Sequence, residues 1–514
     1  MSVLAFAAIA LAGAVVATLV RGRRHVGTLV GFAAVIAALA SATVIRADHP
    51  LLLGGGALGG DAYLRLVLSL CLGGGLLVLI VARLATWQPS APGVLLGGAA
   101  GIGLALGLAG TPAALLAAGA ATGAAATLAL ASPAAPSRIR ALMRELRGAT
   151  TSTVIGVIAA AIVPATSGSG RVAQPAAAAL VLVGMALVMA HRFGAIPLHA
   201  RVSRLSDVTP SAALPILGAW LPAAWGLIIV GWAPAALAPY APGLGPERGL
   251  IVALALLTLL FGTLAALLQD EVEHVVAYTI VADAGLALLA LAALDPAARD
   301  AARGWLLVFA ATRTALIGWT IAFRAAFETG RLCDTGGWLR RAPALGVALA
   351  GILVAVVGWP GLLAWDTRLA MLQSATAGPA LLLGYAGSLG TGVAICRMLW
   401  VGAGRSSAAV AGAPGELPRL PAPSSLGTGS VGPDGTVPTD RVVIARESVG
   451  KVRLWLEAAG RNARPALEIN RVPLRAFAVL MLAGLACLVA AGAFGVEAAA
   501  RLPGLAALPS VAGG

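Results

Sequence analysis

The chain has 514 residues, of which 59% are hydrophobic and 11% are charged, and its formal net charge is +14. A soluble protein of this size carries about 25% charged residues, so the composition excludes a soluble globular enzyme and indicates an all-α integral membrane protein. The basic residues lie mainly in short loops between apolar segments, which is typical of membrane topology signals and argues against a nucleic-acid partner.

Apolar windows of membrane-spanning length recur along the chain. Because a helical span needs about 20 apolar residues, the windows predict a polytopic helical bundle of about 14 spans. These are residues 2–20, 26–45, 62–84, 93–109, 112–131, 150–166, 173–191, 210–236, 249–268, 273–294, 301–325, 342–358, 360–402 and 473–495. The window 360–402 is too long for one helix, so we expect it to contain a break followed by a span.

Composition divides the chain into five parts. Residues 1–92 form the N-terminal membrane helices and residues 93–402 the main bundle. Residues 403–446 are rich in Gly, Pro, Ser and Thr, which predicts a flexible linker. Residues 447–472 are predicted to form an amphipathic interfacial segment, as are residues 137–148, and residues 473–514 hold the last span and a tail.

Arginine placement predicts the topology. If spans simply alternate, the arginines of residues 21–24, 138–147, 192–204 and 324–341 all fall on one side of the membrane. The positive-inside rule makes that side the cytoplasm. We therefore expect a protein of the cell's inner (plasma) membrane with its N-terminus outside and the 403–446 linker in the cytoplasm.

Motifs of soluble enzymes are missing from the sequence. There is no Walker A loop, no GxGxxG motif after a predicted strand and no HExxH pair, and the four cysteines form no CxxC motif. We therefore expect no catalytic residue, no bound cofactor and no metal site in this chain. The functional candidates are ionisable residues within or near the predicted spans, because inserting a charge into the membrane costs about 2.5–3.5 kcal/mol on insertion scales.

Three segments carry such residues in a recognisable order. They are HRFGAIPLH at 191–199, QDEVEHVVAYTIVADAG at 269–285 and GWPGLLAWDTR at 358–368. Together they resemble the proton-conducting, antiporter-like subunits of respiratory complex I, in which a lysine-bearing helix enters a V-P-F-H turn, an A-Y-S-S-I-x-H-x-G segment follows and an F-W-G-K segment comes last. The V-P-F-H form favours the subunit N type of NADH-quinone oxidoreductase. Subunits of multisubunit cation/proton antiporters and of membrane-bound hydrogenases are the neighbouring alternatives.

This resemblance implies an antiporter-like core at 93–402, built from two inverted five-helix repeats that each contain a broken helix. Proline and glycine interruptions are the sequence sign of such breaks, which free backbone groups to hold water and charge. The expected positions are Pro210, Pro215 and Pro222 in one repeat, and Gly358, Pro360 and Gly361 in the other.

The resemblance also implies a set of proton-path candidates. The lysine before V-P-F-H corresponds to Arg192, the turn's histidine to His199, and the lysine of the following helix to Pro222. The remaining motif positions fall on Glu273, His274, Asp283 and Arg368, with Asp366 two residues before Arg368. The family's fifth-helix glutamate has no counterpart, because residues 112–131 contain no acidic residue.

Side-chain chemistry limits what these candidates can do. Arginine keeps its positive charge and cannot release the proton, whereas histidine and carboxylates can titrate. Each titrating candidate has an alternative interpretation. His199 is otherwise a loop histidine, Asp283 a carboxylate paired statically with an arginine such as Arg313, and Glu273 and His274 part of a solvated charge run.

The leading functional hypothesis is a non-redox membrane-arm subunit of a proton-translocating NADH-quinone oxidoreductase or a closely related complex. It would provide all or part of a proton path, while NADH, flavin, iron-sulfur clusters and quinone bind in partner subunits. The alternative is a structural antiporter-like subunit that has lost proton translocation. A stand-alone transporter for an organic substrate would need a polar pocket, and polar residues within the predicted spans are few. The expected partners are other membrane-arm subunits and the lipid bilayer.

Overall fold

The structure is a computed structural model that describes residues 1–46, 51–53, 56–84, 88–131, 135–166, 174–358 and 362–404. The linker beyond residue 404, the amphipathic segment 447–472 and the last predicted span lie outside the described residues, as do Pro360 and Gly361.

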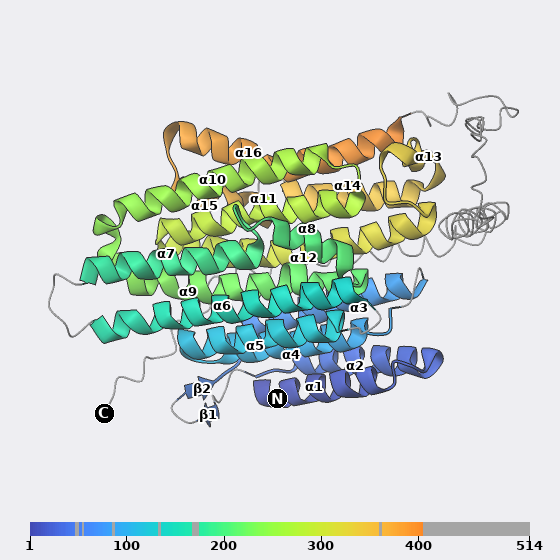
Figure 1. Ribbon diagram of the computed structural model, residues 1–514, viewed down its shortest axis with the longest axis horizontal. Helices are drawn as coiled ribbons and strands as arrows, with labels where there is room; N and C mark the ends of the chain where they lie inside the picture. The colour runs from blue at the N-terminus through green and yellow to red at the C-terminus, as the bar shows by residue number, and fades with distance from the viewer. Residues whose placement is uncertain are drawn as a thin grey trace, which may run out of the picture.

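The helices lie alongside one another in a single bundle, with α1 and α2 at one edge and α10 and α16 at the opposite edge (Figure 1). The α-helices are α1 (Val3–Leu19), α2 (Arg24–Thr43), α3 (Ala62–Leu84), α4 (Ala91–Gly107), α5 (Thr111–Leu130), α6 (Pro136–Thr166), α7 (Gln174–Phe193), α8 (Ala200–Val208), α9 (Leu221–Leu237), α10 (Gly245–Leu268), α11 (Val272–Ala293), α12 (Pro296–Phe327), α13 (Trp338–Arg341), α14 (Pro343–Val357), α15 (Leu363–Ala375) and α16 (Gly378–Ala403). Short 3-10 turns are η1 (Ser211–Ala213), η3 (Ala238–Gly243) and η4 (Cys333–Thr335), and η2 (Ile216–Trp220) is a π-helix. Strands β1 (Leu51–Leu53) and β2 (Gly56–Leu58) form an antiparallel hairpin with Leu51 opposite Leu58.

Length and hydropathy of the helices confirm the predicted all-α, polytopic membrane bundle. Within the described residues, nine helical segments are long and apolar enough to cross a membrane: α2, α3, α5, α7, the segment Ser211–Gly243, α10, α11, α12 and α16. Helices α1, α4 and α14 are shorter apolar helices. The total of about 14 spans and the inverted repeats stay predictions.

Burial separates the centre of the bundle from its lipid-facing rim. The segments around α9, α11 and α12 are almost entirely buried. For α9 and α11 this is expected, because apolar residues lie on all sides of both helices. In contrast, α10 exposes a stripe of leucines, including Leu250, Leu257 and Leu264. Charged side chains on the central helices are therefore shielded from lipid by surrounding helices.

Helix α6 differs from the expectation of a separate interfacial helix at 137–148. It runs unbroken from Pro136 to Thr166, because only Gly148 separates the amphipathic stretch from the apolar one. A single glycine inside a helix costs about 1 kcal/mol, which is too little to end it. The continuous helix carries Glu145 into the bundle, where the residue is 4% exposed.

The first predicted helix break is present. Helix α8 ends at Val208, two residues before Pro210, and Pro215 immediately precedes the π-helical segment η2. Pro222 is the second residue of α9, which follows directly on the π-helical segment η2. The chain therefore changes its helical geometry between 209 and 221, as the prolines predict.

The second break begins at Gly358, which ends α14 with a φ of +74°. A Cβ atom at this position would lie 2.6 Å from the backbone nitrogen of Trp365, so both the backbone conformation and the space require glycine. Helix α15 then begins at Leu363 and is separated from α16 at residues 376–377. The expected break within 360–402 is thus confirmed.

Candidate functional site

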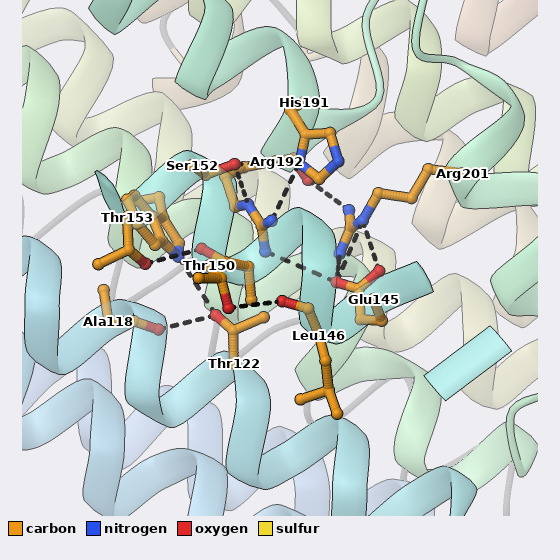
Figure 2. Close-up of polar contacts among 12 residues, drawn as sticks. Ala118, Thr122, Glu145, Leu146, Thr150, Ser152, Thr153, His191, Arg192 and Arg201 are labelled. Atoms are coloured by element: carbon orange, nitrogen blue, oxygen red, sulfur yellow. Dashed lines mark hydrogen bonds and ion pairs between the residues drawn. The ribbon is translucent and has the colours of Figure 1, made fainter. Parts of the chain in front are cut away.

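The first group of buried charges surrounds Glu145 of α6 and is called here the Glu145 cluster (Glu145, Ser152, His191, Arg192 and Arg201). Arg201 donates to both carboxylate oxygens of Glu145, with Nε at 3.2 Å from Oε1 and 2.9 Å from Oε2. Arg192 Nη1 lies 3.6 Å from Oε1 of the same carboxylate. Figure 2 shows both guanidinium groups turned toward this one acid.

Arg192 is held on its remaining sides by neutral groups. Its Nε donates to Ser152 Oγ at 3.2 Å and its Nη2 donates to His191 Nδ1 at 2.9 Å. Because a guanidinium has no acceptor, Nδ1 must be the acceptor, so this contact requires a His191 ring with its proton on Nε2. The guanidinium also lies 5.5 Å from the ring centre of Trp225.

A sharp turn after α7 brings Arg201 into this cluster. Helix α7 ends at Phe193, Gly194 adopts a φ of +77° and the Ile196–Pro197 peptide is cis before α8 begins at Ala200. The chain folds back so that Arg201 Nη1 donates to the carbonyl oxygen of Arg192 at 2.6 Å. A cation at a helix C-terminus is stabilised by the helix dipole, so Arg201 both caps α7 and neutralises Glu145.

Electrostatics keep Glu145 ionised. Burial raises the pKa of its carboxyl group, but the charge and hydrogen bonds of Arg201, followed by the charge of Arg192, outweigh burial and lower the pKa to about 2. At neutral pH this group is therefore a carboxylate shared by two arginines.

The sequence interpretation missed this carboxylate. Helix α5 (Thr111–Leu130) contains no acidic residue, as expected, so it does not supply the carboxylate that pairs with Arg192. The partner comes from α6 instead. The available signal was a lone glutamate in the arginine-rich stretch SRIRALMRELRG, and the predicted interfacial helix placed it outside the bundle.

The second group lies on the central helices and is called here the Asp283 cluster (Asp283, Arg313 and Arg368). Arg313 of α12 donates to Asp283 Oδ2 of α11 through Nε at 2.8 Å and through Nη2. The two side chains are 1% and 8% exposed. The alternative interpretation of Asp283, a static pair with Arg313, matches this geometry.

Arg368 of α15 reaches across the second helix break. Its Nη1 donates to the carbonyl of Val357 at 2.6 Å and its Nη2 donates to the carbonyl of Val356. These are the last carbonyls of α14, whose helical partners end at Gly358. Arg368 is also near enough for the charges of Asp283 and Arg313 to act on it.

The apolar segment formed by η2 and α9 contacts residues beside each cluster. The Trp225 indole faces Arg192 and donates to Thr122 Oγ1 at 3.2 Å, while the Trp220 indole donates to Thr314 Oγ1, next to Arg313, at 2.8 Å. Pro222, which lies between these two tryptophans in the sequence, is also buried. No ionisable side chain occurs from residue 211 to residue 239.

The other sequence candidates lie outside both clusters. His199 packs edge-on against Phe261, with ring centres 4.8 Å apart, and its buried Nδ1 has no hydrogen-bond partner among the described residues. Asp366 is exposed in the first turn of α15, where a negative charge stabilises the N-terminal end of the helix.

Glu273 and His274 belong to a run of surface ion pairs at the start of α11. Glu273 accepts from Arg324 Nη1 at 2.8 Å, and His274 Nε2 lies 2.7 Å from Asp207 Oδ1. Asp270 accepts from Arg397 Nη2 at 3.0 Å and is 61% exposed. This arrangement matches the solvated charge run that was the alternative interpretation, and such exposed pairs contribute about 0–1 kcal/mol each.

The part of the chain that contains both helix breaks is similar to a known family of membrane proteins. Residues 152–394 match the membrane domain described as NADH:quinone oxidoreductase/Mrp antiporter. The matched segment makes up a little less than half of the chain and is similar to this family's membrane domain. It contains Arg192, Asp283 and Arg368, whereas Glu145 precedes it.

Among curated relatives, the chain is 28% identical over 244 residues to NADH-quinone oxidoreductase subunit N of Halorhodospira halophila, covering 45% of this chain and 46% of that protein. It is 30% identical over 220 residues to the subunit N of Rhodococcus opacus, covering 42% of this chain and 40% of that protein. The matches thus span less than half the length of these curated relatives.

Solved structures share the fold over nearly the whole chain. A chain of the Mrp complex from Dietzia sp. superposes with a TM-score of 0.69 at 18% identity, covering 97% of this chain and 96% of that one. A chain of respiratory complex I from Thermus thermophilus gives a TM-score of 0.63 at 19% identity, covering 92% and 99%. At this identity the likeness shows the fold alone, which is that of a multi-pass membrane protein.

Proposed function

We propose that the chain is an antiporter-like membrane-arm subunit of a proton-translocating NADH-quinone oxidoreductase or a closely related complex, and that it provides part of a proton path. The observation that carries the proposal is the placement of a buried carboxylate–arginine group beside each helix break, within the family fold. NADH, flavin, iron-sulfur clusters and quinone would bind in partner subunits. The arginine-rich loops would face the cytoplasm, with the N-terminus outside.

The chemistry of the clusters defines the role of each residue. The side chains of the two clusters that belong to titratable types are the carboxylates of Glu145 and Asp283 and the imidazole of His191, whereas Arg192, Arg313 and Arg368 hold fixed positive charge. Each of these three arginines has a buried nitrogen without a hydrogen-bond partner in the described part of the chain. Since buried donors are normally satisfied, we expect bound water at these nitrogens.

A structural subunit without proton translocation is the second candidate. It is favoured by the apolar segment that contains Trp220, Pro222 and Trp225, where no side chain can carry a proton between the clusters. It is also favoured by the arginine at position 192, which cannot act as a relay lysine would. Under this candidate the ion pairs would serve only to hold helices together.

Proton pumping by the assembled complex distinguishes the two candidates. Inverted membrane vesicles would report the ratio of protons moved to NADH oxidised for the variants Glu145→Gln and Asp283→Asn. Glu328→Gln at an exposed position and Asp300→Asn at a half-buried one are matched controls, because they remove the same groups from residues outside the clusters.

The proton path predicts a lower ratio for a cluster variant and an unchanged ratio for both controls. An unchanged ratio in both cluster variants, with normal assembly, would favour the structural candidate. Failure of the chain to copurify with any other respiratory-complex subunit would overturn the proposed function itself.

A further inference from the structure

A cleft of about 520 Å³ lies between the start of α6, the turn after α7 and helix α8. Arg140 and Arg144 line it from α6, and Arg201 and Arg204 line it from α8. The residues come from segments that are distant in sequence, so the convergence of four guanidinium groups is a product of the fold.

Both carboxylates that line this cleft already have a basic side chain as partner. Glu145 is bound by Arg201 and Arg192, and Asp207 lies 2.7 Å from His274 Nε2. By contrast, Arg140, Arg144 and Arg204 are exposed. Across the described ranges, the side chains of these three arginines have no hydrogen bond or ion pair. The cleft therefore has a surplus of positive charge with free donors.

Phosphate is the anion that best matches this donor set, because the planar guanidinium fork binds phosphate oxygens in a bidentate manner. The cleft also has an apolar wall that includes Ala141, Leu198 and Leu205, and Leu198 is 37% exposed. A basic pocket between membrane helices with an apolar side is suited to a lipid head group.

We propose that this cleft binds a phosphate group, supplied either by the diester of an anionic phospholipid or by free phosphate. The apolar wall favours the lipid. Arg140, Arg144 and Arg204 take no part in the Asp283 or Glu145 clusters, so the proposed site can be tested without a change to either cluster.

The test uses the purified full-length chain in detergent and native mass spectrometry with titrated phosphatidylglycerol, phosphatidylcholine or inorganic phosphate. The double variant Arg140→Gln/Arg144→Gln removes two cleft arginines. The matched control, Arg138→Gln/Arg147→Gln, removes the same charge from the same helix at residues that do not line the cleft. Arg204→Gln tests the α8 side, and thermal melting verifies that every variant is folded.

We expect the cleft variants to weaken phosphatidylglycerol binding about tenfold for each arginine removed, as for loss of a charge-assisted hydrogen bond, while the control changes little. Saturable displacement by inorganic phosphate, without a preference for phosphatidylglycerol over phosphatidylcholine, would assign free phosphate as the source. Equal weakening in the control and the cleft double variant would overturn the proposal, because binding would then follow overall charge. Absence of saturable binding for both phosphatidylglycerol and phosphate would also overturn it.

Discussion

The Glu145 cluster and the Asp283 cluster each combine one carboxylate with two arginines, but they use the second arginine differently. In the Glu145 cluster both guanidinium groups bind the acid. In the Asp283 cluster one binds the acid and Arg368 binds the last carbonyls of α14. The Glu145 cluster also reaches an open cleft through Arg201, whereas Arg313 is buried on all sides. Because both clusters contain two arginines, the main difference between them is that the Glu145 cluster has access to water from the cleft.

The largest expected effect comes from Asp283→Asn. The change leaves the buried Arg313 charge without its counterion, so the free energy of unfolding should fall by about 3–5 kcal/mol. Reversible unfolding in mixed micelles with increasing dodecyl sulfate measures this change. The double variant Asp283→Asn/Arg313→Met should recover most of the loss. A cost no larger than that of Glu145→Gln would contradict the difference drawn between the clusters.

Glu145→Gln should cost less, about 1.5–3 kcal/mol for its charged hydrogen bonds, because Arg201 can be hydrated from the cleft. Since the pKa of Glu145 is lowered from 4.5 to about 2 in the folded protein, its contribution to stability is fully present above pH 4.5. That contribution is lost as the pH falls from 4.5 toward 2. The stability difference between the parent and Glu145→Gln, measured by melting at each pH, should shrink over this window. A constant difference would show that Glu145 is not held ionised by the arginines.

Arg368→Gln tests the arginine that binds a helix end. Loss of a cation from the C-terminus of α14 should lower the free energy of unfolding by about 1–2 kcal/mol. The same mixed-micelle unfolding measures it, and Arg368→Lys should retain part of the effect because it keeps the charge. A loss as large as that of Asp283→Asn would mean that Arg368 serves mainly as a counterion.

The smallest effect is expected from Trp225→Phe, which removes the hydrogen bond to Thr122 and weakens the contact with Arg192 for a total of about 1 kcal/mol. Trp220→Phe is the matched change beside Arg313, where the lost partner is Thr314. Similar small costs, with no change in the pH profile of Glu145, are expected if the segment only separates the clusters. A shifted profile in Trp225→Phe would show that the indole controls access to Glu145.

The sequence predicted much of the fold because long apolar windows and proline or glycine interruptions are local signals. Arg192, Asp283 and Arg368, which fall on ionisable positions of the family resemblance, are buried in the bundle, and their part in a proton path stays a prediction. Glu145 was not found because its pairing depends on contact between helices, 56 positions from Arg201, and on a continuous α6. His199 was placed correctly at the turn, but its neighbours come from α10, which no local pattern specifies.

Arg201 connects the Glu145 cluster to the basic cleft. One guanidinium holds Glu145, caps α7 and lines the cleft. If an anion in the cleft draws on that guanidinium, it weakens the hold on Glu145, and protonation of Glu145 frees the guanidinium for the anion. Thermodynamic linkage requires the two effects to be equal in free energy, so the occupancy of the cleft and the charge of Glu145 would each report on the other.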